Sequence, residues 1–208
     1  MIVLLLFLQI IPQNESVVYE TDEKGKIGKL TAESQMDSLG LRVDYVSDRE
    51  ITVILDTSNL STLYVRKIVK GELVFEMEKE SGYDVYFNGF HYRRSDKNPV
   101  YDRHTLDFAL RGFDYHTDFK EMFRLHIPEL TIVNAELEVI GEERIVTPVG
   151  VFDCWKVQMK PRVIFINRRF FFYIEKEYPR RFVKYADPSG ESSITLIEYQ
   201  NNTEMDEL

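Results

Sequence analysis

Apolar and polar side chains alternate along much of the chain. In residues 41–45 the odd positions are apolar and the even positions are charged, and similar alternation recurs in 72–78, 83–88 and 135–140. A strand with this period of two turns one face toward a core and the other toward water, as in antiparallel sheets. The pattern predicts a mainly β protein, and we expect one curved antiparallel sheet, a half-barrel.

Turn-forming residues divide these segments into about a dozen strands. Lys70-Gly71 and Asn88-Gly89 are typical of tight turns, because glycine adopts the positive φ angles that such turns require. The segment 91–100 interrupts the series, and we expect it to be an exposed loop. The predicted strands lie near 29–37, 41–47, 51–57, 61–69, 72–80, 83–88, 121–127, 130–146, 150–160, 163–176, 180–186 and 192–200.

One segment departs from the alternation. Near 102–111, Leu106 and Leu110 have the spacing of one helical face. Asp102 can cap the start of a helix and Gly112 can end it. We therefore expect one short helix, lying against the concave face of the sheet or across its mouth.

Residues 2–11 form an apolar run interrupted only by a glutamine. As a helix the run would be about 15 Å long, which is too short to cross a bilayer but matches the core of a secretory signal. No basic residue precedes it and no typical cleavage site follows, so a buried first strand is the alternative. We expect a signal or targeting segment at 1–13, a single β domain at 17–200 and a frayed acidic tail at 201–208.

The composition of the chain excludes several kinds of partner and site. Acidic residues outnumber basic residues, 35 to 26, for a net charge of −9. Binding to a nucleic-acid backbone needs the opposite excess, so we expect no nucleic-acid partner. The single cysteine excludes an internal disulfide and a cysteine zinc site. No later apolar run reaches transmembrane length, and no motif indicates a cofactor.

Candidate catalytic residues are few. The one cysteine, Cys154, is expected to be a small buried side chain of a strand. His104 and His116 have the acidic neighbours Asp107 and Asp118 and could converge on a hydrolase site. The histidines lack the spacing of zinc ligands, and we expect surface or loop positions, with no catalytic or metal role, for His91, His104, His116 and His126.

A basic and aromatic window covers 160–184. It holds eight basic residues and two acidic ones, together with several aromatic side chains. Such a window could bind an acidic amphiphile, with the head group on the arginines and the tail in the apolar interior. The alternative is a solvated strand face whose long basic side chains cover aromatic rings. The candidate ligand-binding residues are Trp155, Phe165, Phe171, Tyr173, Phe87, Arg168, Arg169, Arg180 and Arg181.

A motif in the C-terminal half carries a family resemblance. The pattern T-P-x-G-x-F-x-x-x-K-V consists of Thr147, Pro148, Gly150, Phe152, Lys156 and Val157. The chain resembles an exported bacterial family of unknown function that is similar in fold to the lipoprotein carriers LolA and LolB. This resemblance implies a curved antiparallel sheet around an apolar cavity, with short helices plugging the opening, and it supplies no catalytic residues.

Three functions follow in order of preference. The first is a non-enzymatic protein of the periplasm or cell envelope that binds a lipid or other amphiphile in the concave face of the sheet. The second is a structural or interaction module that docks an envelope protein and fills its core with its own side chains. The third is a hydrolase with a histidine and carboxylate site. The volume of the cavity distinguishes the first two, since ligand sites measure about 300–1,000 Å³.

Overall fold

The computed structural model describes residues 11–12, 14–96, 98–128, 131–163 and 168–202. Residues 1–10, 13 and 203–208, which include most of the predicted targeting segment and tail, lie outside the described residues, as do 164–167 with the candidate Phe165.

Within these described ranges, fifteen strands form one sheet. The first eight are β1 (Asn14–Glu23), β2 (Lys26–Met36), β3 (Leu41–Val46), β4 (Arg49–Leu55), β5 (Thr62–Val69), β6 (Glu72–Lys79), β7 (Tyr83–Phe87) and β8 (Phe90–Arg94). After the helical segment and the short β9 (Val100–Asp102) come β10 (Lys120–Ile127), β11 (Thr131–Thr147), β12 (Gly150–Pro161), β13 (Phe170–Glu175), β14 (Phe182–Ala186) and β15 (Ser192–Asn201). The helical segment follows β9 directly along the chain.

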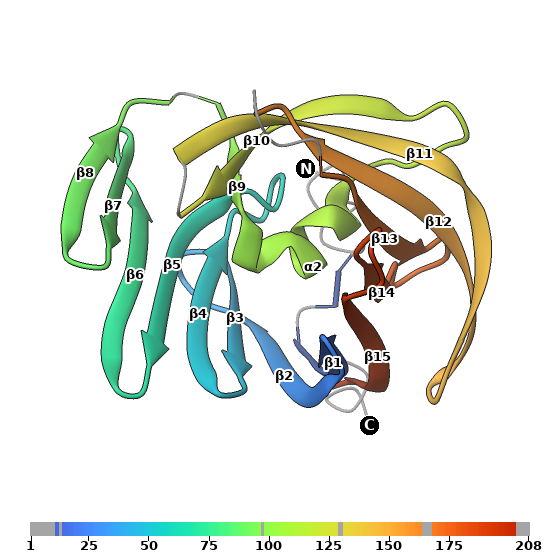
Figure 1. Cartoon of the computed structure of the whole chain (residues 1–208). Helices are drawn as coiled ribbons and strands as arrows, with labels where there is room; N and C mark the ends of the chain where they lie inside the picture. The colour runs from blue at the N-terminus through green and yellow to red at the C-terminus, as the bar shows by residue number, and fades with distance from the viewer. Residues whose placement is uncertain (1–10, 13, 97, 129–130, 164–167, 203–208) are drawn as a thin grey trace.

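Two meanders make up the sheet. Its strand order is β8-β7-β6-β5-β4-β3-β2-β1-β15-β14-β13-β12-β11-β10-β9, so the pairing of β1 with β15 joins an N-terminal and a C-terminal half. Every neighbouring pair is antiparallel except β9 and β10, which are parallel. The predicted fold class, a mainly β protein with one short helix, is confirmed, and the strands curve around the helix in Figure 1.

The prediction of an exposed loop at 91–100 is wrong at both ends of this range, which form strands, whereas residues 95–96 and 98–99 lie outside any strand. Residues Phe90–Arg94 form β8, which pairs with β7, and Val100–Asp102 form β9. The cause is the two-residue turn at Asn88-Gly89, where both residues have positive φ angles of 46° and 88°. This turn type matches the twist of the adjoining strands, and it pairs Phe87 with Phe90. The charged residues in this segment interrupt the alternation of apolar and polar positions, so the sequence pattern does not predict this strand.

The predicted helix is present and consists of three consecutive turns. They are the 3-10 turn η1 (Arg103–Thr105), the α-helical turn α2 (Leu106–Ala109) and the 3-10 turn η2 (Leu110–Gly112), here called the inner helix. The carboxylate of Asp102 caps the start by accepting the backbone N–H of His104. The expected cap and the expected end at Gly112 are both confirmed.

The inner helix divides the core in two. Leu106, Ala109 and Leu110 pack into a cluster with the C-terminal strands, whereas Phe108 packs into a cluster with the N-terminal strands. Both clusters consist mainly of inward-facing side chains from strands in which buried and more exposed residues alternate. The inner helix is therefore the element that lets one sheet enclose two apolar cores.

A buried ion pair attaches the inner helix to β1. The guanidinium of Arg111, 1% exposed, donates to both carboxylate oxygens of Glu15, which is also 1% exposed. Arg111 also donates to the carbonyl oxygen of Pro179 at 3.1 Å, and the Tyr199 hydroxyl donates to Glu15 at 3.1 Å. A buried charge is tolerated only when it is paired and hydrogen-bonded. Both charges of this pair are, although the buried Nε of Arg111 has no hydrogen-bond partner among the described residues.

We predict that Arg111→Met destabilises the protein by about 3–5 kcal/mol, because it leaves the Glu15 carboxylate buried without its cation. The double variant Glu15→Met with Arg111→Met should recover at least half of this loss, and urea unfolding at pH 7 measures both. Lys24→Met breaks the exposed pair with Glu191 and is the control, with an expected change under about 1 kcal/mol. A double variant that is no more stable than Arg111→Met alone would contradict the prediction.

Candidate functional site

A cavity of about 680 Å³ opens on one side of the inner helix. It is lined by β1 to β4, by the inner helix, by β10 and by β12 to β15. Its volume lies within the range of about 300–1,000 Å³ that is usual for small-molecule sites. The apolar and aromatic lining consists of Tyr19, Ile27, Leu30, Tyr45, Ile51, Leu106, Leu125, Ile127, Met159, Pro161, Phe170, Phe172, Phe182, Tyr185 and Ile194.

Charged side chains surround the cavity. We call them the charged rim, and most of them are exposed. Arg49 donates to Asp48 at 3.0 Å, and Lys29 on β2 lies 3.7 Å from Glu198 on β15, across the intervening β1. The cavity therefore has apolar walls and an opening of mixed charge. The rim consists of Asp22, Glu23, Lys26, Lys29, Asp48, Arg49, Arg103 and Arg168.

Asp107 brings a carboxylate from the inner helix to the cavity wall. Its Oδ1 accepts a hydrogen bond from the Tyr45 hydroxyl at 2.6 Å, whereas its buried Oδ2 has no hydrogen-bond partner among the described residues. Burial raises the pKa of Asp107 to about 6, although the Tyr45 hydrogen bond and the positive charge of Arg111 act in the opposite direction. A carboxyl group with this pKa changes charge close to neutral pH.

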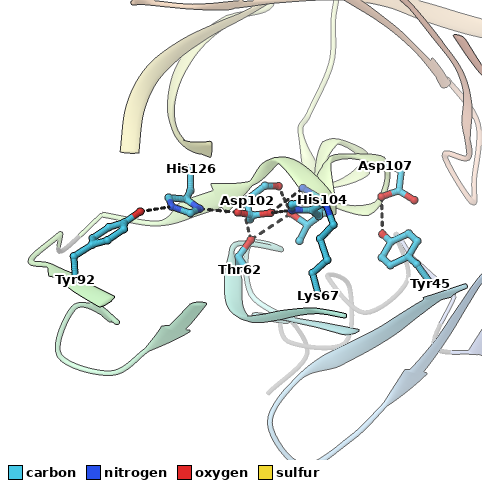
Figure 2. A network of polar contacts seen from close by, with 9 residues as sticks. Tyr45, Thr62, Lys67, Tyr92, Asp102, His104, Asp107 and His126 are labelled. Carbon is cyan, nitrogen blue, oxygen red and sulfur yellow. Dashed lines mark hydrogen bonds and ion pairs between the residues drawn. The ribbon is translucent and has the colours of Figure 1, made fainter. Parts of the chain in front are cut away.

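A second polar cluster lies at the start of the inner helix, and Figure 2 shows it. The fully buried carboxylate of Asp102 accepts from Nδ1 of His104 through one oxygen and from Nδ1 of His126 through the other, both at 2.7 Å. The hydroxyl of Thr62 accepts the backbone N–H of Asp102 at 2.9 Å. We call Asp102, His104 and His126 the His-Asp-His cluster.

The outer nitrogen of each histidine also has a partner. Nε2 of His104 lies 3.5 Å from Nζ of Lys67, and Nε2 of His126 lies 3.3 Å from the Tyr92 hydroxyl. An ammonium group can only donate, so Nε2 of His104 accepts and its proton resides on Nδ1. Both ring nitrogens of His104 therefore have a polar partner.

Burial and hydrogen bonding oppose each other at Asp102. Burial by itself would raise the pKa of this carboxyl, but His104 and His126 outweigh it and hold the pKa well below its usual range. The Phe75 ring stacks on both imidazoles, with ring centroids 5.7 Å from His104 and 5.5 Å from His126. Asp102 is thus an anion that two imidazoles and one phenyl ring shield from water.

The His-Asp-His cluster joins the two ends of the sheet. Tyr92 belongs to β8 at one end of the strand order, and His126 belongs to β10 near the other end. Thr62 and Lys67 lie on β5. The chain of contacts therefore spans the opening between two sheet edges that no backbone ladder closes.

The expectation of surface or loop positions is wrong for two of the four histidines. His126 is fully buried on β10, and the His104 side chain is only 10% exposed, whereas His91 and His116 are exposed. The hydrolase alternative considered a convergence of His104 with His116, and the structure instead brings His104 and His126 to the carboxylate of Asp102. The capping spacing of Asp102 and His104 was visible in the sequence, but the contribution of β10 required the tertiary fold.

Within the described ranges, no three histidine, cysteine or acidic side chains are arranged to hold a metal ion. In the His-Asp-His cluster both Nδ1 atoms are directed at the carboxylate rather than at a common point. Cys154 is buried, as expected, and burial raises the pKa of its thiol to about 12.

Of the candidate ligand-binding residues, the structure places Arg168 at the cavity. Three of the others are contacted by lysines instead. Nζ of Lys176 lies 4.3 Å from the centroid of the Trp155 ring, and Nζ of Lys156 lies 5.9 Å from Phe171 and 5.4 Å from Tyr173. This pattern fits the alternative interpretation, in which basic side chains cover aromatic rings of a strand face.

The remaining candidates also lie away from the cavity lining. Arg181 forms a two-point ion pair with Glu175 at 2.7 Å, and Arg180 donates to the carbonyl oxygen of Phe113 at 3.1 Å. Phe87 packs against the N-terminal core cluster, and Arg169 is exposed. Ligand binding by these residues stays a prediction.

On β13 the residues that do line the cavity are Phe170 and Phe172, which alternate with the predicted Phe171 and Tyr173. This segment is continuously apolar, so its sequence has no polar positions to mark the outward face. A shift of one residue exchanges the two faces of a strand. The sequence therefore indicated the correct strand but not the side chains that it turns inward.

No protein-family model and no curated protein matches the sequence. Among solved structures, the fold is similar to that of a beta-barrel-like protein of the domain of unknown function DUF1849 from Brucella abortus. The TM-score is 0.54 at 12% identity, over 92% of this chain and 98% of that chain. This likeness supports the expected resemblance to a domain of unknown function at the level of fold.

Two further solved structures match less well. MucB has a TM-score of 0.38 at 12% identity, over 95% of this chain and 57% of that chain. A Bacteroides fragilis protein with a YmcC-like fold has a TM-score of 0.37 at 14% identity, over 92% and 99% of the two chains. Scores this low support no argument, and the likeness to LolA and LolB stays a prediction.

No helix in the described part of the chain has the length and hydropathy of a membrane span.

We predict that Asp102→Asn destabilises the protein by roughly 3 kcal/mol, because the carboxamide accepts from one imidazole and presents its own N–H to the other. Urea unfolding at pH 7 measures the change. Asp118→Asn, at an exposed position, is the control, with an expected change within about 0.5 kcal/mol. A loss below about 1 kcal/mol for Asp102→Asn would show that the His-Asp-His cluster does not hold the sheet ends together.

We predict that Asp107→Asn stabilises the protein at pH 8 by on the order of 2 kcal/mol. The pKa of about 6 lies above the unfolded value of about 3.9, so ionisation costs stability above pH 6 and nothing below about pH 4. Asparagine keeps an oxygen for the Tyr45 hydroxyl. Unfolding at pH 8 and pH 4 tests this, since the gain should disappear at pH 4; an equal gain at both pH values would refute the assigned pKa.

Proposed function

We propose that this protein is a non-enzymatic binding protein of the cell envelope, which holds a lipid or similar amphiphile between the curved sheet and its inner helix. The cavity of about 680 Å³ is the observation that carries the proposal. Its walls are formed by aromatic and aliphatic side chains from both halves of the sheet, and its opening carries charges of both signs. An amphiphile has the matching division into an apolar tail and a polar head.

The volume favours a ligand over a self-filled core. A structural module would fill its concave face with its own side chains, and the inner helix does fill one part of it. Phe108, Ala109 and Leu110 are fully buried there. On the other side of the inner helix, however, an apolar surface is left beside an empty volume of ligand size. Burying such a surface is favourable in proportion to its area, and a bound tail would accomplish this.

The His-Asp-His cluster is the feature that would support a hydrolase, because it brings two histidines to one carboxylate. A general base needs a nitrogen directed at the substrate. Here Nε2 of His104 faces Lys67 and Nε2 of His126 faces Tyr92. The nearby hydroxyls of Thr62 and Thr105 are buried and bonded to each other at 3.2 Å. These contacts favour a role in joining the sheet ends over a role in catalysis.

The proposed location in the periplasm or cell envelope is supported by the apolar run at 2–11, whose length matches the core of an export signal. An envelope protein also meets lipids and other amphiphiles as its ordinary surroundings. The net charge of −9 fits partners other than nucleic acid.

We predict that filling the cavity abolishes binding of an apolar fluorescent probe, N-phenyl-1-naphthylamine. Ile194 on β15 lines the cavity, and Ile194→Trp places a larger ring there. The expected result is at least a tenfold loss of probe affinity at unchanged circular dichroism, measured by fluorescence titration. Ile140→Trp makes the same change at an exposed position on β11 and is the matched control, with wild-type affinity expected.

Failure of the wild-type protein to bind the probe would overturn the proposal. Equal affinity of the wild-type protein and the Ile194→Trp variant would also overturn it, because the probe would then bind outside the cavity.

A further inference from the structure

The buried oxygen of Asp107 is an unsatisfied acceptor at the cavity wall. Tyr45 donates to Oδ1 at 2.6 Å, and Oδ2 has no hydrogen-bond partner among the described residues. Buried polar atoms in folded proteins are almost always hydrogen-bonded, so an exception of this kind requires an explanation. Because Asp107 is one of the residues that line the cavity, a ligand is a natural source of the missing donor.

The neighbouring groups leave this acceptor open. Arg111, on the next turn of the inner helix, donates through its two terminal nitrogens to Glu15 and to the carbonyl oxygen of Pro179, and its buried Nε makes no hydrogen bond to Asp107. Tyr19, on β1, lies close enough for the negative charge of Asp107 to act on it, and burial is the main cause that raises its pKa well above 10. Tyr19 and Tyr45 therefore stay protonated at neutral pH, and the charge of Arg111 acts on Asp107 without a hydrogen bond to Oδ2.

The charged rim discriminates between ligand head groups less strongly than Asp107 does. Arg49 is paired with Asp48, and Lys29 lies within reach of Glu198. Most of the rim is exposed, so water and salt weaken its interactions with a ligand. A buried group discriminates more sharply, because a ligand that leaves it unpaired loses a full hydrogen bond.

We propose that the cavity selects amphiphiles whose polar end donates a hydrogen bond, an amine or a hydroxyl, to Oδ2 of Asp107. This inference rests on the proposed function and adds the chemical class of the head group. The apolar tail then lies among Phe170, Phe172 and Phe182. An amphiphile with a carboxylate head offers only acceptors and would place its charge against that of Asp107.

The test uses three probes with one tail: decylamine, 1-decanol and decanoate, each below its aggregation concentration. Their displacement of N-phenyl-1-naphthylamine from the full-length protein at pH 8 gives three affinities. For the wild-type protein we expect the amine and the alcohol to bind at least tenfold more tightly than decanoate. Asp107→Asn keeps an acceptor for Tyr45 but presents N–H donors to the ligand, and it should reduce the ratio of amine to decanoate affinity at least tenfold.

Asp118→Asn is the matched control, since it makes the same chemical change at an exposed carboxylate outside the cavity lining. It should leave the ratio within about twofold of the wild-type ratio. Tyr45→Phe is the second variant, to be used if Asp107→Asn does not fold. It removes the competing donor and keeps the carboxylate, so the preference for the amine should rise at least twofold.

The outcomes separate the two proposals. If none of the decyl probes displaces the dye from the wild-type protein, the proposed function fails together with this inference. If all three bind with similar affinity and Asp107→Asn leaves their ratios unchanged, amphiphile binding stands and the assignment of Asp107 is overturned. An unchanged or reduced preference for the amine in Tyr45→Phe would also overturn the assignment.

Discussion

The fold depends on the placement of a short helix, with buried charged side chains beside its apolar ones, inside a curved sheet. The inner helix and its cap carry three charged side chains, Asp102, Asp107 and Arg111, into the concave face. Each is matched by a partner from a different strand: His126 from β10, Tyr45 from β3 and Glu15 from β1. Because unpaired charge is costly in an apolar interior, these contacts fix the position of the helix. The division of the interior into two cores and one cavity follows from that position.

The three charged side chains differ in how completely their polar atoms are hydrogen-bonded. Asp102 accepts from two imidazoles and a backbone N–H, and Arg111 has both a carboxylate and a carbonyl acceptor. Asp107 alone among these three keeps a buried oxygen without a partner. It is also the one of the three that lines the cavity. The Asp102 and Arg111 contacts therefore attach the helix, although the buried Nε of Arg111 has no partner among the described residues. Asp107 is the one whose unpartnered atom belongs to a cavity-lining residue, and it is the place where a ligand can contribute.

The pairing of distant sheet ends explains why a sheet with two free edges stays curved. The strand order begins with β8 and ends with β9, and no backbone ladder connects them. Side chains connect them instead, through Tyr92, His126 and Asp102, with Phe75 stacked on both imidazoles. This arrangement keeps the concave side narrow enough for a short helix to fill part of it.

The sequence by itself determined the fold class, most strands, the short helix, and the residues that begin and end it. Alternation, turn residues and capping are local properties, and they can be read along the chain. It also indicated the correct aromatic strand of the cavity. In a continuously apolar run such as 170–174, however, it could not tell Phe170 and Phe172 from Phe171 and Tyr173.

Only the tertiary structure decided which side chains meet. His126 lies 24 residues from Asp102, and Arg111 lies 96 residues from Glu15. The alternation pattern of the sequence does not reveal such pairs, because they form only when strands far apart in the chain curve around one helix. The cavity and its unsatisfied carboxylate are likewise properties of the assembled sheet, since their lining comes from both halves of the chain.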